Sequence, residues 1–360
     1  MKNILVTGGA GFIGSNFVRC LLDNEPDINI VNLDALTYAG SLENLNDLPF
    51  PDRHTFVHGD ICDRSAVDNL MEQNEIDTIV HFAAETHVDR SIAGPGVFVQ
   101  TNIVGTFTLL ESAKSYWQSD KSGSDGDNKF HHVSTDEVHG DLSPSDPAWT
   151  EESPYEPNSP YAASKASSDH LVRSYDRTYN LPYTITNCSN NYGPYQFPEK
   201  LIPLVVLNAM EGRAIPVYGD GMQVRDWLFV GDHCEAILEV LRHGTIGETY
   251  NIGGNNQTTN IDLVRIICDT MDLAFPTSGH VPHRDLISYV KDRPGHDRRY
   301  ALSTDKIHRE LNWQPKKSID TGMQETLEWY IHNPEWISAV RNQPQYQAWL
   351  DDNYSKRRKP

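Results

Sequence analysis

The 360-residue chain is poor in cysteine and lacks the spacings that cysteine-based sites require. Its five cysteines are Cys20, Cys62, Cys188, Cys234 and Cys268, an odd and scattered set in which no two form a CxxC pair. Disulfide-stapled secreted domains usually carry even sets of cysteines within a short chain. The sequence therefore predicts five free, mostly buried thiols and a reducing compartment.

Long apolar runs are also missing from the chain. No run approaches the roughly 18 residues that a membrane-spanning helix needs. The first apolar run, Ile4-Leu5-Val6, stands so close to the start that it leaves no room for the charged and apolar regions of a signal peptide. We therefore expect a cytoplasmic protein with no membrane partner.

Basic residues are in deficit. Lys and Arg number 30 against 50 Asp and Glu, which gives a formal net charge of −20. Nucleic acids and anionic membranes require a basic surface, so this balance argues against a nucleic-acid partner. A few local cations can still hold one anionic small molecule. The 15 histidines form no HExxH motif or Cys/His ligand spacing, and no metal is expected.

What the chain does contain begins with a glycine-rich turn. Gly9, Gly11 and Gly14 have the G-x-G-x-x-G spacing, between an apolar run and an amphipathic helical pattern. Such a turn lets the backbone approach a pyrophosphate, whose charge the helix N-terminus stabilises. Asp34 ends the next apolar run, where a carboxylate binds the adenosine ribose and repels a 2′-phosphate. The pattern predicts NAD rather than NADP; a glycine-rich turn that has lost its ligand is the alternative.

Apolar runs and helical patterns alternate through the first half of the chain, as in proteins with a buried parallel sheet. This alternation predicts an α/β fold, with a Rossmann-type doubly wound parallel sheet and a smaller α/β substrate-binding lobe. The expected NAD-binding domain comprises residues 1–187, with returning segments at about 222–255 and 300–312. The expected substrate domain comprises about 188–221, 256–299 and 313–345, and a polar tail follows at 346–360.

Two short segments carry candidate acid–base chemistry. Thr135-Asp136-Glu137 follows a predicted strand, and Tyr161 and Lys165 stand four residues apart, on one face of a predicted helix. An adjacent ammonium lowers the pKa of a tyrosine, which ordinarily lies near ~10. Two adjacent carboxyl groups in a closed site raise each other's pKa, so that one can act as an acid. The alternatives are helix-start carboxylates and a solvated Tyr/Lys face.

Together these segments resemble the extended short-chain dehydrogenase/reductases and, within them, the dTDP-glucose 4,6-dehydratase family. The likeness covers about residues 1–330 and includes ETHVDRS at 85–91, NNYGPY at 190–195 and RPGHD at 293–297. In the related families, 4-epimerases lack both acids, GDP-mannose dehydratases keep only the glutamate, and CDP-glucose dehydratases have lysine where Glu137 stands. The resemblance implies that a homodimer converts dTDP-glucose to dTDP-4-keto-6-deoxyglucose, holding NAD tightly and recycling it each turnover.

The resemblance also implies individual roles. Tyr161 takes the 4-hydroxyl proton, Lys165 lowers the Tyr161 pKa and binds the nicotinamide ribose, and Thr135 bonds the oxygen at C4. Glu137 removes the C5 proton, and Asp136 protonates the departing 6-hydroxyl. The implied cofactor site comprises Gly8, Gly11, Phe12, Ile13, Gly14, Asp34, Asp60, Ile61, Ala83, Ala84, Tyr161, Lys165 and Asn187. The implied substrate site comprises His87, Thr135, Asn191, Lys200, Leu201, Val217, Tyr218, Arg225, Asn260, Arg293 and His296.

Several alternatives remain open at this level. A surface ion pair with Asp226 or Asp220 is the alternative to a diphosphate contact for Arg225. His139 replaces a tyrosine of the family pattern, either as a tolerated change or as a group that alters the pKa of the acidic pair. The alternative functions are another nucleotide-sugar 4,6-dehydratase, a 4-epimerase, or an NAD-binding regulatory protein without catalysis.

Overall fold

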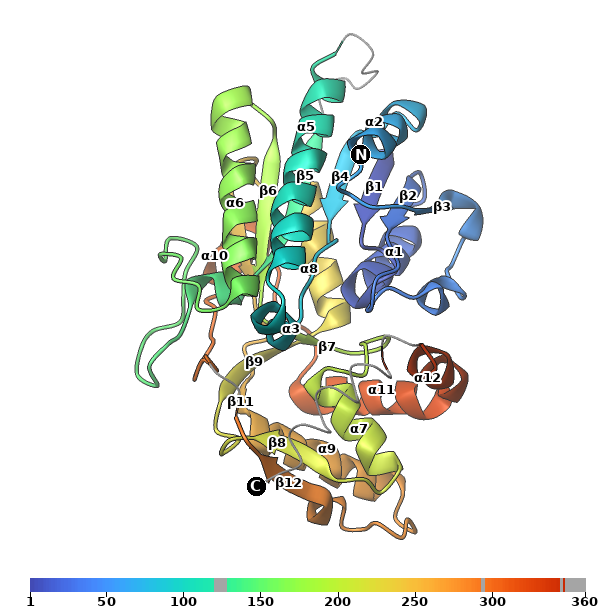
Figure 1. Cartoon of the computed structure of the whole chain (residues 1–360), viewed down its shortest axis with the longest axis vertical. Coiled ribbons are helices and arrows are strands. Elements are labelled where there is room, and N and C mark those ends of the chain that lie inside the picture. Colours follow the sequence, from blue (N-terminus) through green and yellow to red (C-terminus); the bar gives the residue numbers. More distant parts are fainter. Residues whose placement is uncertain (120–127, 293–294, 344–345, 347–360) are drawn as a thin grey trace.

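The computed structural model describes residues 1–119, 128–292, 295–343 and 346 (Figure 1). Arg293 and residues 347–360 of the expected polar tail lie outside the described residues. All five cysteines carry free thiols, three of them buried and two half-buried, as the sequence predicts. In the described part of the chain, no helix is long and apolar enough to cross a membrane.

A seven-stranded, fully parallel sheet forms the first lobe, in the order β10-β6-β5-β4-β1-β2-β3 (Figure 1). The central strands are buried on both faces, which explains the apolar runs of β1 and β4, whereas β5 and β6 also bury histidine and threonine side chains. The strands are β1 (Asn3–Thr7), β2 (Asn29–Asp34), β3 (His54–His58), β4 (Thr78–His81), β5 (Lys129–Thr135), β6 (Tyr183–Cys188) and β10 (Thr249–Ile252). This sheet confirms the predicted Rossmann-type fold.

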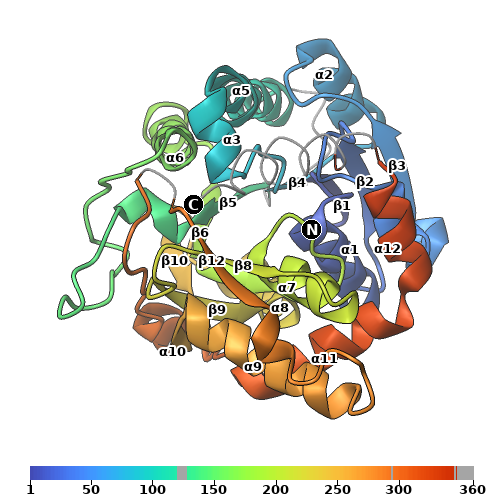
Figure 2. The ribbon, with the colours of Figure 1, turned by 60° about the horizontal axis from the view of Figure 1, so that its bottom comes forward.

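Helices cover both faces of this sheet, and two separate apolar cores result. On one face α1 (Phe12–Asn24) and α8 (Val230–His243) pack together. On the other face lie α2 (Arg64–Gln73), α5 (Thr106–Trp117) and α6 (Pro160–Tyr179), with α5 and α6 side by side (Figure 2). The shorter helical segments of this lobe are η1 (Leu42–Leu45), η2 (Pro51–Arg53), α3 (Val88–Ala93), α4 (Gly96–Phe98), the π-helical η3 (Val99–Gly105), η4 (Asp136–His139) and α10 (Asp305–Leu311).

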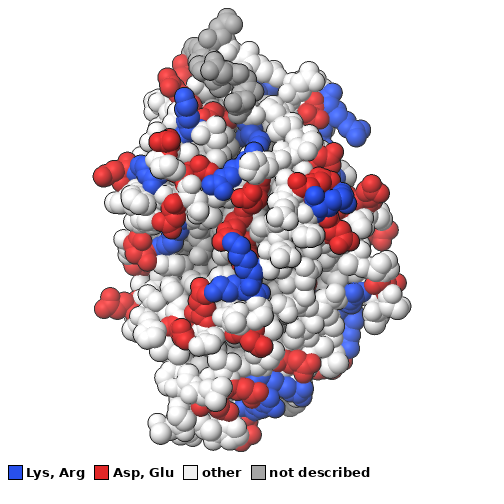
Figure 3. Space-filling view, turned by 180° about the vertical axis from the view of Figure 1, so that it is seen from behind, with Lys and Arg blue, Asp and Glu red and all other residues white. Residues whose placement is uncertain are grey.

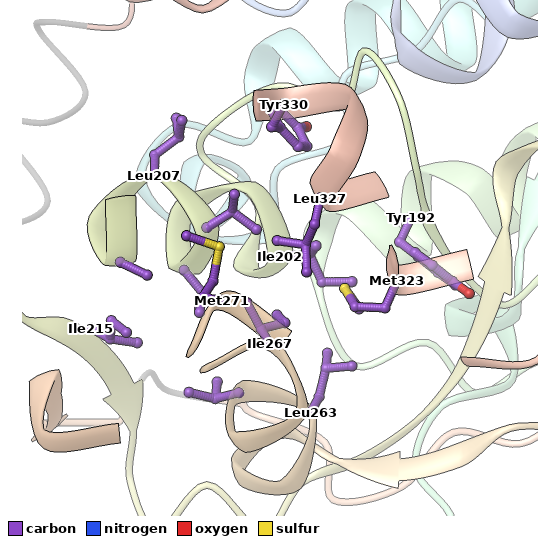
Figure 4. Packing of buried hydrophobic residues seen from close by; sticks show 14 of the residues in the cluster. Tyr192, Ile202, Leu207, Ile215, Leu263, Ile267, Met271, Met323, Leu327 and Tyr330 are labelled. Atoms are coloured by element: carbon purple, nitrogen blue, oxygen red, sulfur yellow. The ribbon is translucent and has the colours of Figure 1, made fainter. Parts of the chain in front are cut away.

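The second lobe has its own core of aliphatic, methionine and aromatic side chains, part of which Figure 4 shows. Two small sheets accompany them, β7-β9-β11 and the parallel pair β8-β12. The strands are β7 (Asn190–Tyr192), β8 (Ile215–Tyr218), β9 (Val224–Phe229), β11 (Gln257–Thr259) and β12 (Ile287–Val290). The helices are α7 (Leu201–Met210), α9 (Asn260–Ala274), η5 (His283–Leu286), α11 (Ile319–His332) and α12 (Pro334–Arg341).

One detail of the expected domain division needs correction. The returning segment was expected to begin near residue 222, but its first strand, β9, pairs with β7 and β11 instead of joining the parallel sheet. The Asp226 carboxylate accepts hydrogen bonds from the backbone N–H groups of Gly254 (2.8 Å) and Asn256 (2.6 Å), which holds β9 against the loop after β10. The chain therefore returns to the first lobe with α8. The division as a whole stays a prediction.

Candidate active site

The glycine-rich turn between β1 and α1 lines the larger of two cavities, with a volume of about 320 Å³. Gly8 has a φ of +75°, and a Cβ there would lie 2.6 Å from the Ala83 nitrogen. A Cβ on Gly14 would lie 2.2 Å from the Gly8 carbonyl oxygen. The backbone approaches so closely at these two glycines that no side chain would fit there, and α1 therefore packs tightly against the turn and the segment after β4. The N–H groups of the first turn of α1, which have no acceptor within the helix, lie beside the cavity.

Asp34 ends β2 at the same cavity and is almost fully buried. Its two carboxyl oxygens accept hydrogen bonds from the backbone N–H groups of Ala10 (2.9 Å) and Leu36 (2.8 Å). Burial raises the pKa of Asp34, and these two hydrogen bonds partly offset that effect. Each oxygen keeps a further lone pair, which is what a pair of ribose hydroxyls requires. A glycine turn, a helix N-terminus and this carboxylate together fit NAD.

The predicted cofactor residues meet at this cavity with one exception. Asn187 is fully buried and does not line it; its side-chain nitrogen lies 3.5 Å from His139 Nε2. Its role in cofactor binding stays a prediction. The residues that do line the cavity are Gly8, Gly11, Phe12, Ile13, Gly14, Asp34, Asp60, Ile61, Ala83, Ala84, Tyr161 and Lys165.

The two adjacent carboxyl groups follow the C-terminal end of β5 and lie in unlike surroundings. Thr135 begins η4 by accepting a hydrogen bond from Glu137 N–H, and its hydroxyl also lies 3.3 Å from Asp136 Oδ1. Asp136 is 2% exposed, and burial, then the charge of Glu137, raises its pKa well above the ordinary value. Glu137 is only half-buried and lines the cavity. The geometry therefore favours Asp136 as the protonated acid and Glu137 as the accessible base.

Tyr161 and Lys165 lie on successive turns of α6, as expected, but the electrostatics differ from the prediction. Burial, and next the Glu137 carboxyl, raise the pKa of Tyr161 well above 10. Lys165 Nζ donates to the Val133 carbonyl oxygen (2.8 Å), and burial lowers its own pKa to about 8. The chain alone therefore opposes the phenolate, first because Tyr161 is buried and next because of the Glu137 carboxyl group.

A second cavity, of about 210 Å³, lies on the side of the smaller lobe. The two cavities meet beside Glu137, since both are lined by Thr86, Glu137, Asn190, Asn191, Gln196, Glu199 and Lys200. Thr135 lines only the first cavity, and Arg293 lies outside the described residues. The predicted substrate residues that line the second cavity are His87, Asn191, Lys200, Leu201, Val217, Tyr218, Arg225, Asn260 and His296.

Arg225 is buried in the wall of this second cavity rather than on the surface, where the alternative ion pair would lie. Its guanidinium donates to the backbone carbonyls of Val224 and Asp297, both at 2.8 Å, and lies 4.2 Å from the centre of the Tyr300 ring. Of its two possible partners, Asp220 is paired with Arg298, and Asp226 accepts backbone N–H groups. A buried cation beside a cavity is suited to bind an anionic ligand.

Sequence reasoning missed a third carboxyl group at the junction of the two cavities. Glu199 is buried, and its Oε2 lies 3.8 Å from His87 Nε2 and 3.7 Å from an Arg90 guanidinium nitrogen. Burial raises the pKa of Glu199 to about 7. Its only signal in the sequence was its position beside Lys200, in a segment of turn-forming and aromatic residues.

His139 lies beneath the acidic pair, away from both cavities. Its ring stacks on Trp149 with centroids 5.3 Å apart, and Nδ1 lies 3.2 Å from the Pro154 carbonyl oxygen. Burial lowers the pKa of His139. Among the described residues, no cluster of three or more His, Cys, Asp or Glu side chains is placed to hold a metal ion.

Comparisons with known proteins agree with this geometry. The family model described as GDP-mannose 4,6 dehydratase matches residues 5–326. The dTDP-glucose 4,6-dehydratase of Shigella flexneri is 53% identical over 98% of this chain and 99% of its own length. The crystal structure of DesIV, a dTDP-glucose 4,6-dehydratase from Streptomyces venezuelae with NAD and TYD bound, has a TM-score of 0.85 and 47% identity, covering 94% of this chain and 99% of that one.

A UDP-glucose 4-epimerase from Thermotoga maritima, with UDP-glucose, is also similar in structure. It has a TM-score of 0.80 but only 29% identity, covering 92% of this chain and 99% of its own. The scaffold is thus shared with epimerases, whereas the high sequence identity is shared with the dehydratases. The chain belongs to the dTDP-glucose 4,6-dehydratase family of the short-chain dehydrogenase/reductases.

Proposed function

We propose that this protein is an NAD-dependent hydro-lyase that converts dTDP-glucose to dTDP-4-keto-6-deoxyglucose and water. The observation that carries this proposal is the position of Asp136 and Glu137, because the cofactor cavity and the substrate cavity meet at Glu137. A sugar held there has its reacting carbons between the cofactor and an acid–base pair. The substrate itself is proposed from relatives that carry that name.

The first step removes the C4 hydrogen and the proton of the 4-hydroxyl. NAD held at the glycine-rich turn would supply the hydride acceptor for C4 and the hydride donor for C6, and its positive charge would favour an anion nearby. Tyr161 receives the hydroxyl proton, and Thr135, which lines the same cavity, orients the oxygen at C4. Lys165 also lines this cavity and would bind the nicotinamide ribose.

The second step eliminates water from the 4-ketone. The carbonyl group acidifies the proton at C5, which Glu137 removes as a general base. Asp136 gives its proton to the 6-hydroxyl as the bond between C6 and oxygen breaks. Its raised pKa keeps that proton available at neutral pH, and its Oδ2 has no hydrogen-bond partner among the described residues. Glu137 then returns a proton to C5 as the hydride reaches C6.

The proton balance of this sequence assigns one more task to Thr135. After one turnover Tyr161 has gained a proton and Asp136 has lost one, while substrate and product differ only by water. One proton must therefore move from Tyr161 to Asp136 before the next turnover. The Thr135 hydroxyl lies 3.3 Å from Asp136 Oδ1 and shares the wall of the first cavity with Tyr161, so it offers a path for this proton.

The experiment that tests the function is an assay with dTDP-glucose, in which mass spectrometry detects a product that has lost water and kept its dTDP group. Glu137→Gln should lower turnover by roughly 10²- to 10⁴-fold, because it removes a general base. It should still form NADH, and it should no longer exchange the C5 hydrogen with solvent deuterium. Glu152→Gln, on the exposed loop before α6, is the matched control. Full dehydration by Glu137→Gln would contradict the assigned role.

A panel of sugar nucleotides separates the alternatives. GDP-mannose, CDP-glucose and UDP-glucose, offered in place of dTDP-glucose, test a dehydratase for another nucleotide. A 4-epimerase would return an isomer of unchanged mass. An NAD-binding protein without catalysis would give no transient NADH absorbance with any of them.

We also propose a homodimer that works in the cytoplasm. Apolar side chains remain exposed along one side of the first lobe: Val99 in η3 is 48% exposed, Phe107 in α5 46%, and Tyr179 at the end of α6 41%. A second copy of the chain would cover this area. The five free thiols support the reducing compartment.

A further inference from the structure

A fully buried carboxylate lies behind the active site and has no part in the steps above. Asp169 follows Lys165 by one turn of α6 and is 0% exposed, as is His132 on the adjacent strand β5. Neither residue lines a cavity. An isolated buried charge is costly, so a carboxylate in this position requires a partner of opposite charge.

His132 connects this carboxylate to the active-site lysine. Its Nε2 lies 3.2 Å from Asp169 Oδ1 and 3.4 Å from Lys165 Nζ. Asp169 Oδ2 accepts hydrogen bonds from the hydroxyls of Ser134 (2.8 Å) and Tyr155 (2.9 Å). The carboxylate is thus fixed from two sides, by β5 and by the loop before α6. Such contacts stabilise its ionised form, and with the His132 contact they hold the pKa of Asp169 below its ordinary value despite burial.

The protonation of His132 can be assigned from these contacts. Burial lowers its pKa to about 4, so the ring is neutral at neutral pH. His132 Nδ1 has no hydrogen-bond partner among the described residues. Asp169 Oδ1 also has no hydrogen-bond partner among the described residues, so the 3.2 Å contact with His132 Nε2 is an electrostatic contact only. The Lys165 ammonium can only donate, and it is placed to donate to His132 Nε2. His132 is therefore neutral, and the negative charge near Lys165 stays on the carboxylate.

The other titratable groups near these three residues are His81 on β4, His131 on β5, His139 in η4, Tyr155 in the loop before α6, Tyr161 and Arg173 on α6, and Cys188 on β6. Among the described residues, Asp169 is the carboxyl group whose charge raises the pKa of Lys165. Burial lowers the pKa of the three histidines and raises that of Tyr155 and Cys188, so these five are neutral near pH 7. Arg173 is positive and donates to Tyr155 and Thr249.

We propose that Asp169 is a positioning residue of the active site, whose buried carboxylate is the counter-charge that keeps the Lys165 ammonium protonated and seated against the Val133 carbonyl. His132, Ser134 and Tyr155 hold that carboxylate in place. The consequence for catalysis rests on the proposed function, because Lys165 serves the cofactor and Tyr161 only if this is a dehydrogenase-type site. The effect on the charge of Lys165 does not depend on the substrate.

The direct test is the titration of Lys165 in protein labelled with ¹³C at the lysine ε-carbon, its NMR signal assigned by its loss in Lys165→Arg. In the native protein the signal should titrate near pH 8, the pKa given above. Asp169→Asn should move the midpoint at least one pH unit lower. Asp176→Asn, on the same helix, should leave it unchanged, as should Tyr155→Phe, which keeps the charge of Asp169. An unchanged midpoint in Asp169→Asn would overturn the proposal.

Activity provides the second readout. In Asp169→Asn, the basic limb of the pH–rate profile should move to lower pH together with the Lys165 midpoint. At pH values above the basic limbs of both proteins, each pH unit of this shift should lower kcat about tenfold. The KM for dTDP-glucose should stay within about twofold, since Asp169 lines neither cavity. A loss of kcat that is equal at every pH would indicate a structural role and overturn the proposal. A shifted Lys165 midpoint without activity toward any sugar nucleotide would instead refute the proposed function alone.

A stability cycle keeps the test decisive if Asp169→Asn does not fold. Removing one member of a buried pair leaves an unbalanced charge, whereas removing both does not. Lys165→Met combined with Asp169→Asn should therefore be more stable than Asp169→Asn alone, as measured by urea unfolding. A double variant that is no more stable than Asp169→Asn would show that the two charges are not coupled, and would overturn the proposal.

Discussion

Asp136 and Glu137 are neighbours in the chain, and their chemical difference comes from where β5 ends. Because η4 turns the chain directly after Thr135, the Asp136 side chain is enclosed while the Glu137 side chain reaches both cavities. Desolvation acts on one carboxyl much more than on the other. The proposed acid and the proposed base are thus two residues with almost the same intrinsic pKa.

The departure from the family at His139 has a measurable consequence for stability. The folded protein holds His139 neutral with a lowered pKa, while the unfolded chain takes up a proton below pH 6.5. Native stability is therefore lost as pH falls below 6.5, by up to ~1.4 kcal/mol per pH unit from this residue. In His139→Tyr this loss should disappear. As pH decreases, the free energy of unfolding measured in urea should therefore fall less for the variant than for the native protein.

The same substitution should leave catalysis unaffected. A neutral His139 adds no charge near Asp136, whose pKa is set by burial, Glu137, Arg225 and Asp226. The pH–rate profiles of the native protein and His139→Tyr should therefore superimpose above pH 6.5. A displaced acidic or basic limb would show that His139 does act on the acidic pair.

Arg225 allows a prediction about substrate affinity. Its guanidinium is buried in the wall of the second cavity, and a hydrogen bond to a charged group contributes about 1.5–3 kcal/mol. Arg225→Ala should therefore raise the KM for dTDP-glucose roughly 10- to 100-fold. Arg298→Ala, at an exposed arginine paired with Asp220, is the control and should change KM little. An unchanged KM in Arg225→Ala would remove this residue from the diphosphate site.

At the scale of single elements, the two glycines that frame the start of α1 should respond differently to the same methyl group. In Gly14→Ala the new Cβ would lie 2.2 Å from the Gly8 carbonyl oxygen and 2.8 Å from Gly9 Cα, so α1 must move. This overpacking should cost about 1–3 kcal/mol of stability. In Gly11→Ala the only close atom is the Gly8 oxygen, at 3.2 Å, and the methyl group lies at the cofactor cavity.

The two variants should therefore separate stability from cofactor binding. Gly14→Ala should unfold at a lower urea concentration, whereas Gly11→Ala should stay near the native midpoint and retain less NAD after purification. NAD content can be measured by absorbance after the protein is denatured. Equal losses of stability in both variants would show that the close approach at Gly14 is not what fixes α1.

The elements that sequence predicts well are those whose own residues decide their environment. The parallel strands could be predicted because burial on both faces imposes continuous apolar runs, as at Ile4–Val6 in β1. The sequence could not indicate to which sheet β9 belongs, because its partners β7 and β11 are distant in the chain. For the same reason local spacing placed Tyr161 over Lys165 but gave no sign of His132 and Glu199, whose neighbours come from other elements.

At the scale of the whole molecule, the chain is acidic, but basic side chains line the cavity where the proposed anionic substrate would bind. Acidic and basic side chains are intermingled on the face shown in Figure 3. Three basic side chains instead line the second cavity, namely Lys200, Arg225 and His296. A substrate diphosphate thus meets cations inside the protein, although the net charge of −20 repels anions at longer range.

The exposed apolar side of the first lobe gives the prediction for the assembly. Phe107 is 46% exposed on α5, next to α6, and two copies related by a twofold axis would bury it against the same helices of the partner. Phe107→Glu would place a charge in that interface, where removal from water is costly. We therefore expect the mass from light scattering to fall from that of two chains to that of one.

The matched control is Leu273→Glu, because Leu273 is the most exposed of the large apolar residues described and lies on α9 of the other lobe. If exposure alone drove association, this substitution would also dissociate the protein. If the pairing of α5 and α6 drives it, Leu273→Glu should keep the mass of two chains at every concentration. A native protein that already has the mass of one chain would refute the homodimer.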